Sequence, residues 1–401
     1  MRDTASIRSL LTIIVFVIAI GTTCIAGVTT GVPPYQSFGG GPDVINLGNL
    51  NVHYSIPVFG RAGRGTSFGY ALALDSSIWT PSAAWVPNTN WGLHRDTAAL
   101  VGYVSYSATS RTCNDPYGGT GTVSNVTYYS YVDPTGTSHP IYIHTRYDSC
   151  YDTSSNTGPS ISGDGSGVTV RSGGVVTLKS GEVIHAQLLS GGNLTGDGTS
   201  TDGNGNQVTS LTVSGTTTFT DTLGTTALTI TGTAPSSVYY KYTAPSGALA
   251  SVTVAYKTYT VRTNFACSGI NEYGPLSNSL PDKITLPDGS YYQFGYEVTP
   301  GDTNTPHHVI GRIASLRLPT GGTNSYSYTG NNNGIMCADG SAAGFDRTTP
   351  DGTWHYVRSG TSPAYTTAIT TPSDPKTGQT DQTVINFEGG GYLLDSPDPN
   401  P

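Results

Sequence analysis

Charge is scarce in this chain of 401 residues, of which only 11% are Asp, Glu, Lys or Arg. Acid–base catalysis on a glycan needs two convergent carboxylates, but the glutamates share no local motif, and most aspartates stand beside glycine or proline, where turn geometry explains them. The glutamates are Glu182, Glu272, Glu297 and Glu388. Lysine and arginine form no cluster and the formal net charge is −8, which argues against nucleic acid as a partner.

Long apolar runs are also lacking, with one exception at the N-terminus. Arg2 and Arg8 precede an apolar stretch at 10–20, and small residues follow up to Ala26. This order is that of a secretory signal, and the stretch is short for a membrane span, which needs about 20 apolar residues. We therefore expect residues 1–26 to be a signal peptide and the protein to be secreted or at the cell surface. An uncleaved signal that anchors the chain in a membrane is the alternative.

Cysteine is rare as well, with five in the chain. Cys24 would leave with the signal. No two of the others stand at the short spacing of zinc sites, which argues against metal ligation. In an oxidising compartment they would form two disulfides, and sequence alone leaves all pairings open. Because the cost of closing a loop grows with its length, we expect Cys113 with Cys150 and Cys267 with Cys337.

The residues that are abundant favour strands and turns. Glycine, serine, threonine, asparagine and tyrosine dominate, so we predict an all-β protein, a repetitive antiparallel array with long Gly/Ser/Thr-rich loops. Segments 50–58 and 68–74 alternate apolar and polar residues and flank a glycine-rich connection at 60–65, which predicts a hairpin. Further strands are expected at 128–132, 141–147, 168–178, 211–223, 227–230, 237–242 and 251–261.

An internal repeat marks the last third of the chain. Segments starting at Leu286, Leu318 and Thr349 each begin with a Pro-x-Gly turn and continue into a strand rich in aromatic residues. The starts lie 32 and 31 residues apart. A regular step of this size indicates a repetitive β array.

The second of these segments resembles the Rhs/YD repeat. Gly311-Arg312-Ile313 leads through the turn at 318–321 to Tyr326-Ser327-Tyr328, as a Gly-Arg-[Leu/Ile] strand, a turn and a Tyr-x-Tyr strand follow one another in that family. The resemblance is sharp over 284–356 and loose elsewhere. Two features depart from it: Thr329 stands where the aspartate of the Tyr-Asp pair belongs, and no toxin-like segment is recognisable before the end of the chain.

The resemblance implies strands that spiral into a large β-shell, which encloses a C-terminal toxin or presents an adhesive surface. We accordingly expect the signal peptide to be followed by a β-rich region at 27–270 and a YD-like repeat region with a Pro/Gly-rich tail at 271–401. The function implied is that of an exported, non-catalytic scaffold of shell or adhesin type. Its expected partner is a downstream segment of such a protein, or a second copy paired through the C-terminal strand edge at 383–387.

Two short motifs have competing interpretations. Gly65 to Gly69 matches G-x-S-x-G, the nucleophile elbow of hydrolases, with Ser67 as nucleophile, but that motif needs a helix after it, and here a strand is expected. An ordinary hairpin connection is therefore favoured. His307 and His308 are adjacent and would face opposite ways in a strand, which makes them a poor chelate.

Calcium is the one cofactor that the sequence suggests. Asp202, Asn204 and Asn206 offer oxygen ligands at alternate positions, as calcium loops do. Gln207 stands where such a loop has glycine, and Val213 where it has its bidentate glutamate. A polar β-turn is therefore the competing interpretation.

Three tryptophans suggest a second function. Trp79, Trp85 and Trp91 recur every six residues around prolines. On an exposed loop they would form a platform for a surface glycan, which makes a carbohydrate-binding cell-surface module the alternative to the scaffold. Because a tryptophan buries so much area, packing in the core under that loop is the other interpretation.

Overall fold

The computed structural model describes residues 30–31, 37–39, 42–361 and 364–387. Nearly all regular elements in these ranges are β-strands, so the all-β class is confirmed. The helices are single turns: η1 (Thr89–Gly92), α1 (Ala98–Val101) and α2 (Asn331–Gly334). The expected signal peptide at 1–26 lies outside the described residues. Within them, no helix has the length and apolar character needed to cross a membrane.

A small antiparallel sheet forms from the first part of the chain, in the order β1-β2-β3-β4-β7. Its strands are β1 (Ser37–Gly39), β2 (Asp43–Asn46), β3 (Val52–Arg61), β4 (Phe68–Asp75) and β7 (Leu93–His94). The hairpin expected around residues 60–65 is formed by β3 and β4, with a bulge between Pro57 and Phe59. A two-stranded sheet of β5 (Trp79–Thr80) and β6 (Val86–Pro87) follows β4.

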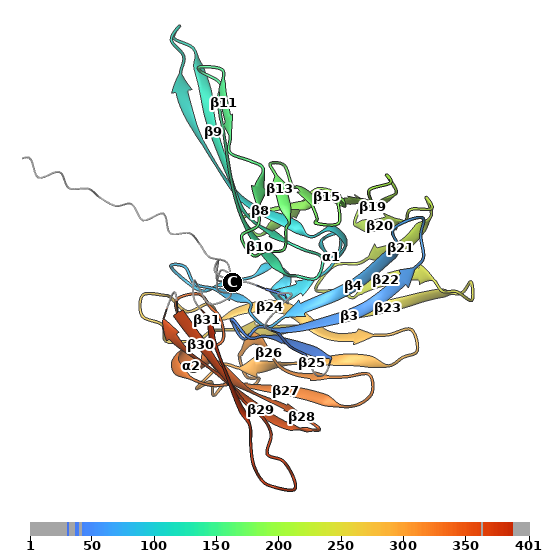
Figure 1. Ribbon diagram of the computed structural model, residues 1–401, viewed down its shortest axis with the longest axis vertical. Helices are drawn as coiled ribbons and strands as arrows, with labels where there is room; N and C mark the ends of the chain where they lie inside the picture. Colours follow the sequence, from blue (N-terminus) through green and yellow to red (C-terminus); the bar gives the residue numbers. More distant parts are fainter. Residues whose placement is uncertain (1–29, 32–36, 40–41, 362–363, 388–401) are drawn as a thin grey trace, which may run out of the picture.

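A second sheet has the order β11-β10-β9-β8-β16-β17. Its strands are β8 (Tyr103–Asn114), β9 (Thr120–Val132), β10 (Ser138–Asp148), β11 (Thr153–Asn156), β16 (Gln187–Ser190) and β17 (Asn193–Thr195). The far halves of β8, β9 and β10, together with β11, project from the rest of the molecule (Figure 1). We call this projection the arm, from residue 106 to residue 156, and the remainder the body.

The third sheet has eighteen strands and makes up most of the body. Its strands, in spatial order, are β12 (Ser160–Ile161), β13 (Thr169–Arg171), β14 (Val175–Thr177), β15 (Val183–His185), β18 (Thr199–Thr201), β19 (Gln207–Val213), β20 (Thr216–Thr220), β21 (Thr226–Thr231), β22 (Val238–Thr243), β23 (Leu249–Val261), β24 (Leu276–Thr285), β25 (Tyr291–Val298), β26 (Val309–Arg317), β27 (Thr323–Tyr328), β28 (Gly344–Thr349), β29 (Gly352–Thr361), β30 (Ala364–Thr370) and β31 (Gln382–Phe387). Each pairs antiparallel with its neighbour in this order, so adjacent strands are joined mainly by short turns.

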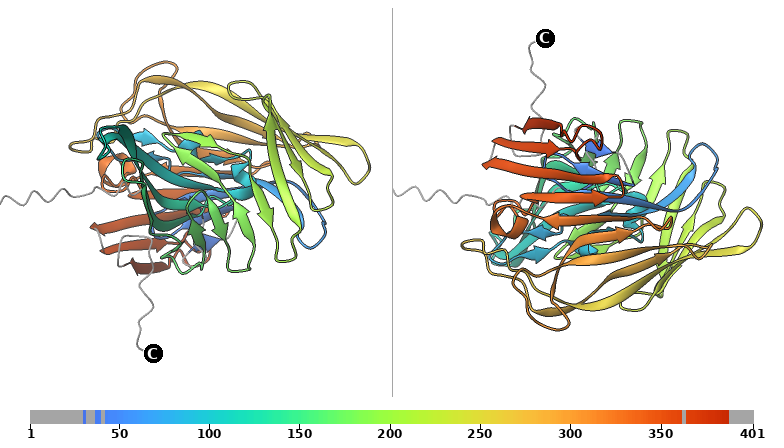
Figure 2. Two further views of the ribbon diagram at one scale, coloured as in Figure 1. Left: turned by 90° about the horizontal axis from the view of Figure 1, so that it is seen from above. Right: turned by 90° about the horizontal axis from the view of Figure 1, so that it is seen from below.

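The large sheet bends around the small one (Figure 2). One continuous core lies between them, to which the small sheet contributes side chains such as Tyr54 and Leu72, and the inner face of the large sheet contributes Phe219, Tyr240 and Phe345. The concave side of the large sheet is therefore filled by the chain's own N-terminal strands. This packing explains the alternation of β3 and β4, since one face of each strand is buried.

A buried polar network ties the small sheet to the C-terminal strands. Arg347 donates from Nε and from a terminal nitrogen to the two carboxylate oxygens of Asp43, at 2.6 and 2.5 Å. Tyr326 donates to Asp43 at 2.6 Å and lies 2.5 Å from the hydroxyl of Tyr54. Burial, and then the negative charge of Asp43, raise the pKa of Tyr54 well above its ordinary value, although the hydrogen bond with Tyr326 acts in the opposite direction. Residues some 280 positions apart are thus fixed to one another.

One five-residue turn recurs through the chain. In each copy the first N–H donates to the fifth carbonyl, and the fourth residue, a glycine with positive φ, donates to the first carbonyl. This is a three-residue hairpin loop with a glycine bulge. The copies lie at 115–119, 133–137, 178–182, 202–206, 221–225, 244–248, 286–290 and 318–322.

The recurring turn changes how the repeat at Leu286, Leu318 and Thr349 is understood. The first two share this turn, but Thr349 pairs with Gly352 across a two-residue turn, so the third unit is of another kind. The shared turn also occurs well before residue 271 and without a fixed step. The boundary expected at residue 270 lies between β23 and β24, which pair directly, so the sheet continues across it.

The C-terminal strand β31 ends the large sheet, with β30 on one side. Ile385 packs against the main core, whereas Val384 is exposed. A charge at residue 385 would therefore disturb the core as well as the edge. Self-association through this edge stays a prediction.

Candidate binding surface

The three tryptophans that suggested a glycan platform pack into the body. Trp79 and Trp85 are fully buried, and their rings meet Phe265 edge to face. Trp91 is partly buried and meets Trp79 edge to face. A sugar ring has no access to the faces of Trp79 and Trp85, so the platform prediction is corrected: these residues are core, as the competing interpretation held.

The calcium candidates lie in one of the five-residue turns. Asp202 accepts the backbone N–H groups of Asn204 and Asn206 at 2.8 and 2.9 Å, and its other oxygen accepts the Asn206 amide at 2.8 Å. The Asn206 side chain and then its backbone N–H lower the pKa of Asp202. A donor, rather than a further oxygen, faces this carboxylate, so the geometry supports the polar turn and not a preformed oxygen cage. Calcium binding stays a prediction without structural support.

Ser67 lies exposed in the connection between β3 and β4. A strand follows it directly, so the strand–turn–helix context of a nucleophile elbow is missing.

The orientation of His307 and His308 differs from the one expected. They lie in the loop before β26, and both Nδ1 atoms contact the carboxylate of Asp302, at 3.3 and 3.1 Å. The expected opposite orientation is wrong because the pair is not in a strand and alternation does not apply.

A buried cluster of two histidines and an aspartate escaped sequence analysis. Asp75, at the end of β4, lies 3.0 Å from His53 Nδ1 and 3.0 Å from His94 Nε2, and Asn51 donates to it at 2.6 Å. Burial alone would raise the pKa of Asp75, but attraction and hydrogen bonding from His53, and then from His94, hold it well below its ordinary value. The carboxylate is ionised and its partners are fixed, so the cluster anchors the fold. The three residues are 22 and 19 positions apart, and no local motif reveals them.

A second histidine cluster lies at the root of the arm. His139 Nδ1 is 2.6 Å from Asp164, its Nε2 is 3.5 Å from Asp133, and its ring stacks on Tyr131. Burial lowers the pKa of His139, but hydrogen bonds and attraction from Asp133 and Asp164 outweigh burial and raise it to about 9. The imidazolium therefore holds the turn between β9 and β10 to the loop before β13.

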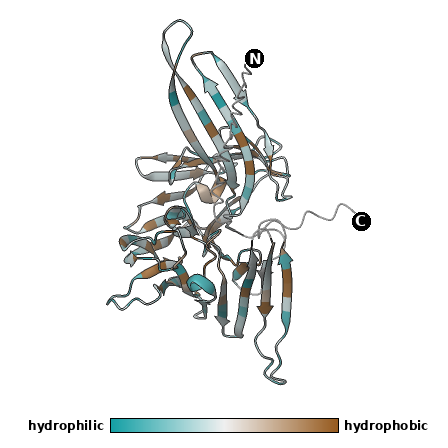
Figure 3. Ribbon diagram, turned by 90° about the vertical axis from the view of Figure 1, so that its left-hand side faces the viewer, coloured by the Kyte–Doolittle hydropathy of each residue, from teal (hydrophilic) through white to brown (hydrophobic). Residues whose placement is uncertain are grey.

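The arm is a single layer of sheet. Residues 107–112 of β8 and all of β11 are exposed, whereas Val123 of β9 and Asp148 of β10 are buried. Its free end carries mainly hydrophilic or near-neutral residues (Figure 3). A sheet with so few buried apolar side chains is marginally stable by itself. Other constraints must hold this one in place.

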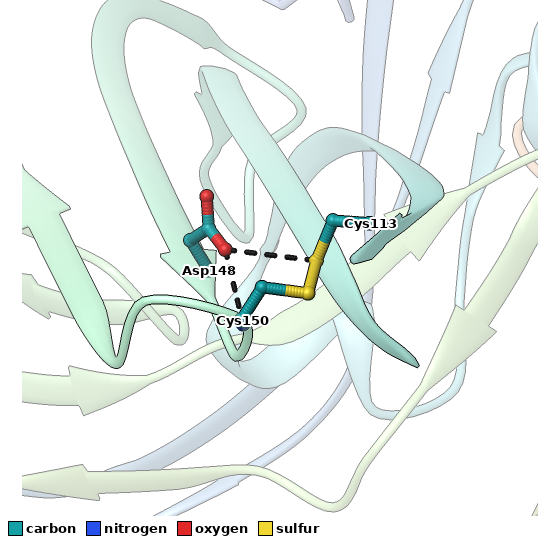
Figure 4. A group of neighbouring side chains, drawn as sticks. All are labelled: Cys113, Asp148 and Cys150. Carbon is teal, nitrogen blue, oxygen red and sulfur yellow. Dashed lines mark hydrogen bonds between the residues drawn. A yellow bond between two sulfur atoms is a disulfide. The ribbon is translucent and has the colours of Figure 1, made fainter. Parts of the chain in front are cut away.

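A disulfide supplies such a constraint. Cys113 at the end of β8 is bonded to Cys150 just after β10, and these strands flank β9 (Figure 4). Asp148 accepts the Cys150 N–H at 3.1 Å and lies 3.7 Å from the Cys113 sulfur, which carries no proton and is only a neighbour. These three residues have the proximity of a metal site, but sulfurs bonded to each other are not available as ligands. The body contains the other expected pair, Cys267–Cys337.

Exposed tyrosines gather on the arm. Of the tyrosines that are exposed in the described chain, all but Tyr239 lie there, and Tyr117 at the β8–β9 turn is 96% exposed. The arm residues are Tyr117, Tyr129, Tyr142, Tyr147 and Tyr151. Tyr117 and Tyr151 each lie near one half of the disulfide in sequence, in turns at the far end. Exposed aromatic residues in a rigid setting are typical of binding surfaces.

Two surface cavities lie on the large sheet. One, of about 140 Å³, is polar and is lined by residues such as Arg262, Asn264 and Asp302. The other, of about 360 Å³, lies where β21 and β22 diverge, beside Thr226, Lys241 and Leu249. Neither brings a serine or cysteine nucleophile together with a histidine base among the lining residues.

Comparisons with known proteins add little to this picture. No family model matches the chain, and no curated protein matches it. Among solved structures it is similar to a porin-like protein from Bacteroides uniformis, at 12% identity and a TM-score of 0.25, over 71% of this chain and 97% of that one. A likeness at this level carries no argument about function.

Proposed function

We propose that the protein is an exported, non-catalytic scaffold that binds at the cell exterior through the tyrosines of its arm. The observation that carries the proposal is their concentration on a projecting element whose edge strand β8 is largely exposed and which Cys113–Cys150 links across β9. Tyrosine offers a large amphipathic contact area at low entropic cost, which suits adhesion. The disulfide supports the expectation of an oxidising compartment.

The filled concave face bears on the form of the scaffold. A shell that encloses another domain needs an empty interior, but here the small sheet occupies the inner side of the large one. This packing favours the adhesive form of an Rhs-like scaffold over the enclosing form. Carbohydrate binding remains the second candidate, with the arm tyrosines in place of the buried tryptophans, because exposed aromatic faces suit sugar rings.

Binding measurements on the full exported chain test the proposal. Neutral glycans on an array and intact cells are the probes, and the double change of Tyr117→Ala with Tyr151→Ala is expected to lower binding about tenfold or more, as loss of aromatic hot spots does. Tyr239→Ala, which removes an exposed tyrosine of the body, is the matched control and should leave binding unchanged. Equal losses for both variants, or none for the arm variant, would contradict the proposal.

A further inference from the structure

The outer edge of β8 is open along most of its length. β16 pairs with β8 at Tyr103, Val104 and Ser105, and beyond these residues no described strand pairs with that edge. The open stretch of nine residues reaches from Tyr106 to Asn114. It is much longer than the other free edge of the arm, β11, and longer than β31 at the end of the large sheet. Long open edges are sites where another strand adds.

The direction of the free backbone groups follows from the turn at the far end. Asp115 donates to Gly119 across the β8–β9 hairpin, and antiparallel pairs alternate between bonded and non-bonded. Thr112, Ser110 and Ala108 fall on non-bonded pairs with β9, so their N–H and C=O groups point outward. The backbone N–H of Thr122, the partner of Thr112 in β9, accordingly points away from β8 and donates to the hydroxyl of Ser149.

We propose that this edge pairs antiparallel with the same edge of a second copy of the chain, with the twofold axis at Ser110. In that register Ser110 meets Ser110 of the second copy and Ala108 meets Thr112, so the outward groups of both strands find partners. The assembly is isologous and closed, as most homodimers are. This inference goes beyond the proposed function, since it does not depend on what the tyrosines bind.

The side chains and the shape of the arm favour a second copy as the occupant. The open edge carries one charged residue, Arg111, and in this register it faces Thr109 of the second copy rather than another arginine. The antiparallel direction places the two bodies at opposite ends of the paired arms, and the arm projects from the body (Figure 1). A second copy therefore offers an open edge of the same length, and the antiparallel pairing places no two like charges opposite each other.

The oligomeric state of the full exported chain is the first test. Light scattering after size exclusion at micromolar concentration should give a dimer, and Ser110→Pro should give a monomer. Proline removes an outward N–H and leaves the bonds between β8 and β9 in place. Ser110→Ala is the matched control and should remain a dimer. A monomeric wild type overturns the proposal, and so does a Ser110→Pro variant as dimeric as the wild type.

A cross-linking test reads the register and does not depend on the proline variant folding. Ser110→Cys places two cysteines opposite each other, with Cα atoms about 5.5 Å apart, within reach of a disulfide. Thr112→Cys places them four residues apart along the strands, at about 13 Å, which is too far. We expect covalent dimers on oxidation of the first variant and not of the second. Equal yields from both, or none from either, would overturn the register.

Discussion

Different interactions stabilise the arm and the body. In the body, side chains of two sheets share one core, and a buried ion pair joins residues from opposite ends of the described chain. In the outer arm β8 and β11 are exposed, few side chains are buried, and a disulfide links the strands. The comparison shows that strands of similar composition can be stabilised in two ways within one chain. A core forms where the strands find a second layer, and a covalent bond is needed where they do not.

The largest effect should come from breaking the ion pair of the body. Asp43→Ala leaves Arg347 buried without its carboxylate, which typically costs about 3–5 kcal/mol. Urea denaturation should show this loss in the global unfolding free energy. The control is Asp346→Ala, which breaks the exposed pair with His355 and should cost less than about 1 kcal/mol. Similar losses for both variants would mean that the Asp43 network does not hold the small sheet to the C-terminal strands.

Removing the arm disulfide should act locally. Replacing Cys113 and Cys150 by serine opens a link across 37 residues, for which loop entropy predicts about 3–4 kcal/mol. Hydrogen exchange should become fast at 107–125, while protection of β20 and β22 is unchanged. The same change at Cys267 and Cys337 should instead lower global stability, because that bond lies in the body. Loss of protection in β20 and β22 on opening the arm bond would show that arm and body unfold together.

Alkaline pH should loosen the root of the arm. The folded pKa of His139 is raised to about 9, above the ordinary 6.5, so its stabilising contribution is present in full below about 6.5 and is lost as pH rises through 9. The loss of folding free energy between these limits is at most about 3.4 kcal/mol. In His139→Gln this part of the pH dependence should vanish, which unfolding at pH 6 and pH 10 measures as a difference from wild type. Parallel pH profiles for the two proteins would contradict it.

The smallest effect is expected at Ser67. Because its side chain is exposed in a hairpin connection, Ser67→Ala should change the unfolding free energy by less than about 0.5 kcal/mol. Any esterase signal of a preparation should persist in this variant, since the elbow lacks its helix. An activity that disappears with Ser67 would argue for an enzyme and against the scaffold.

Local signals in the chain were reliable where local geometry decides. The alternation at 50–58 and 68–74 predicted a hairpin that is present, because burial of one face imposes a period of two. The cysteine spacing led to both disulfides of the structure. The Pro-x-Gly signals at 286 and 318 marked true turns, since glycine at positive φ is a local requirement.

Features that depend on contacts with distant residues could not be predicted from the sequence. Whether Trp85 stacks on a sugar or on Phe265 depends on a residue 180 positions away, and hydropathy does not distinguish the two. The two histidines and Asp75 come from three separate strands, and the pair Asp43–Arg347 joins β2 to β28. No spacing in the sequence therefore reveals either group. The exposed edge of β8 is likewise a property of strand order.

The sequence by itself determined the all-β class and the positions of many turns, because these follow from side-chain alternation and glycine conformation within short stretches. Loop length favoured one pairing of the cysteines among those that the sequence left open. Only the tertiary structure decided that the N-terminal strands fill the inside of the large sheet, and that part of the second sheet projects as an arm. The reason is physical: burial depends on which faces find a second layer, and that choice is made by contacts between residues hundreds of positions apart.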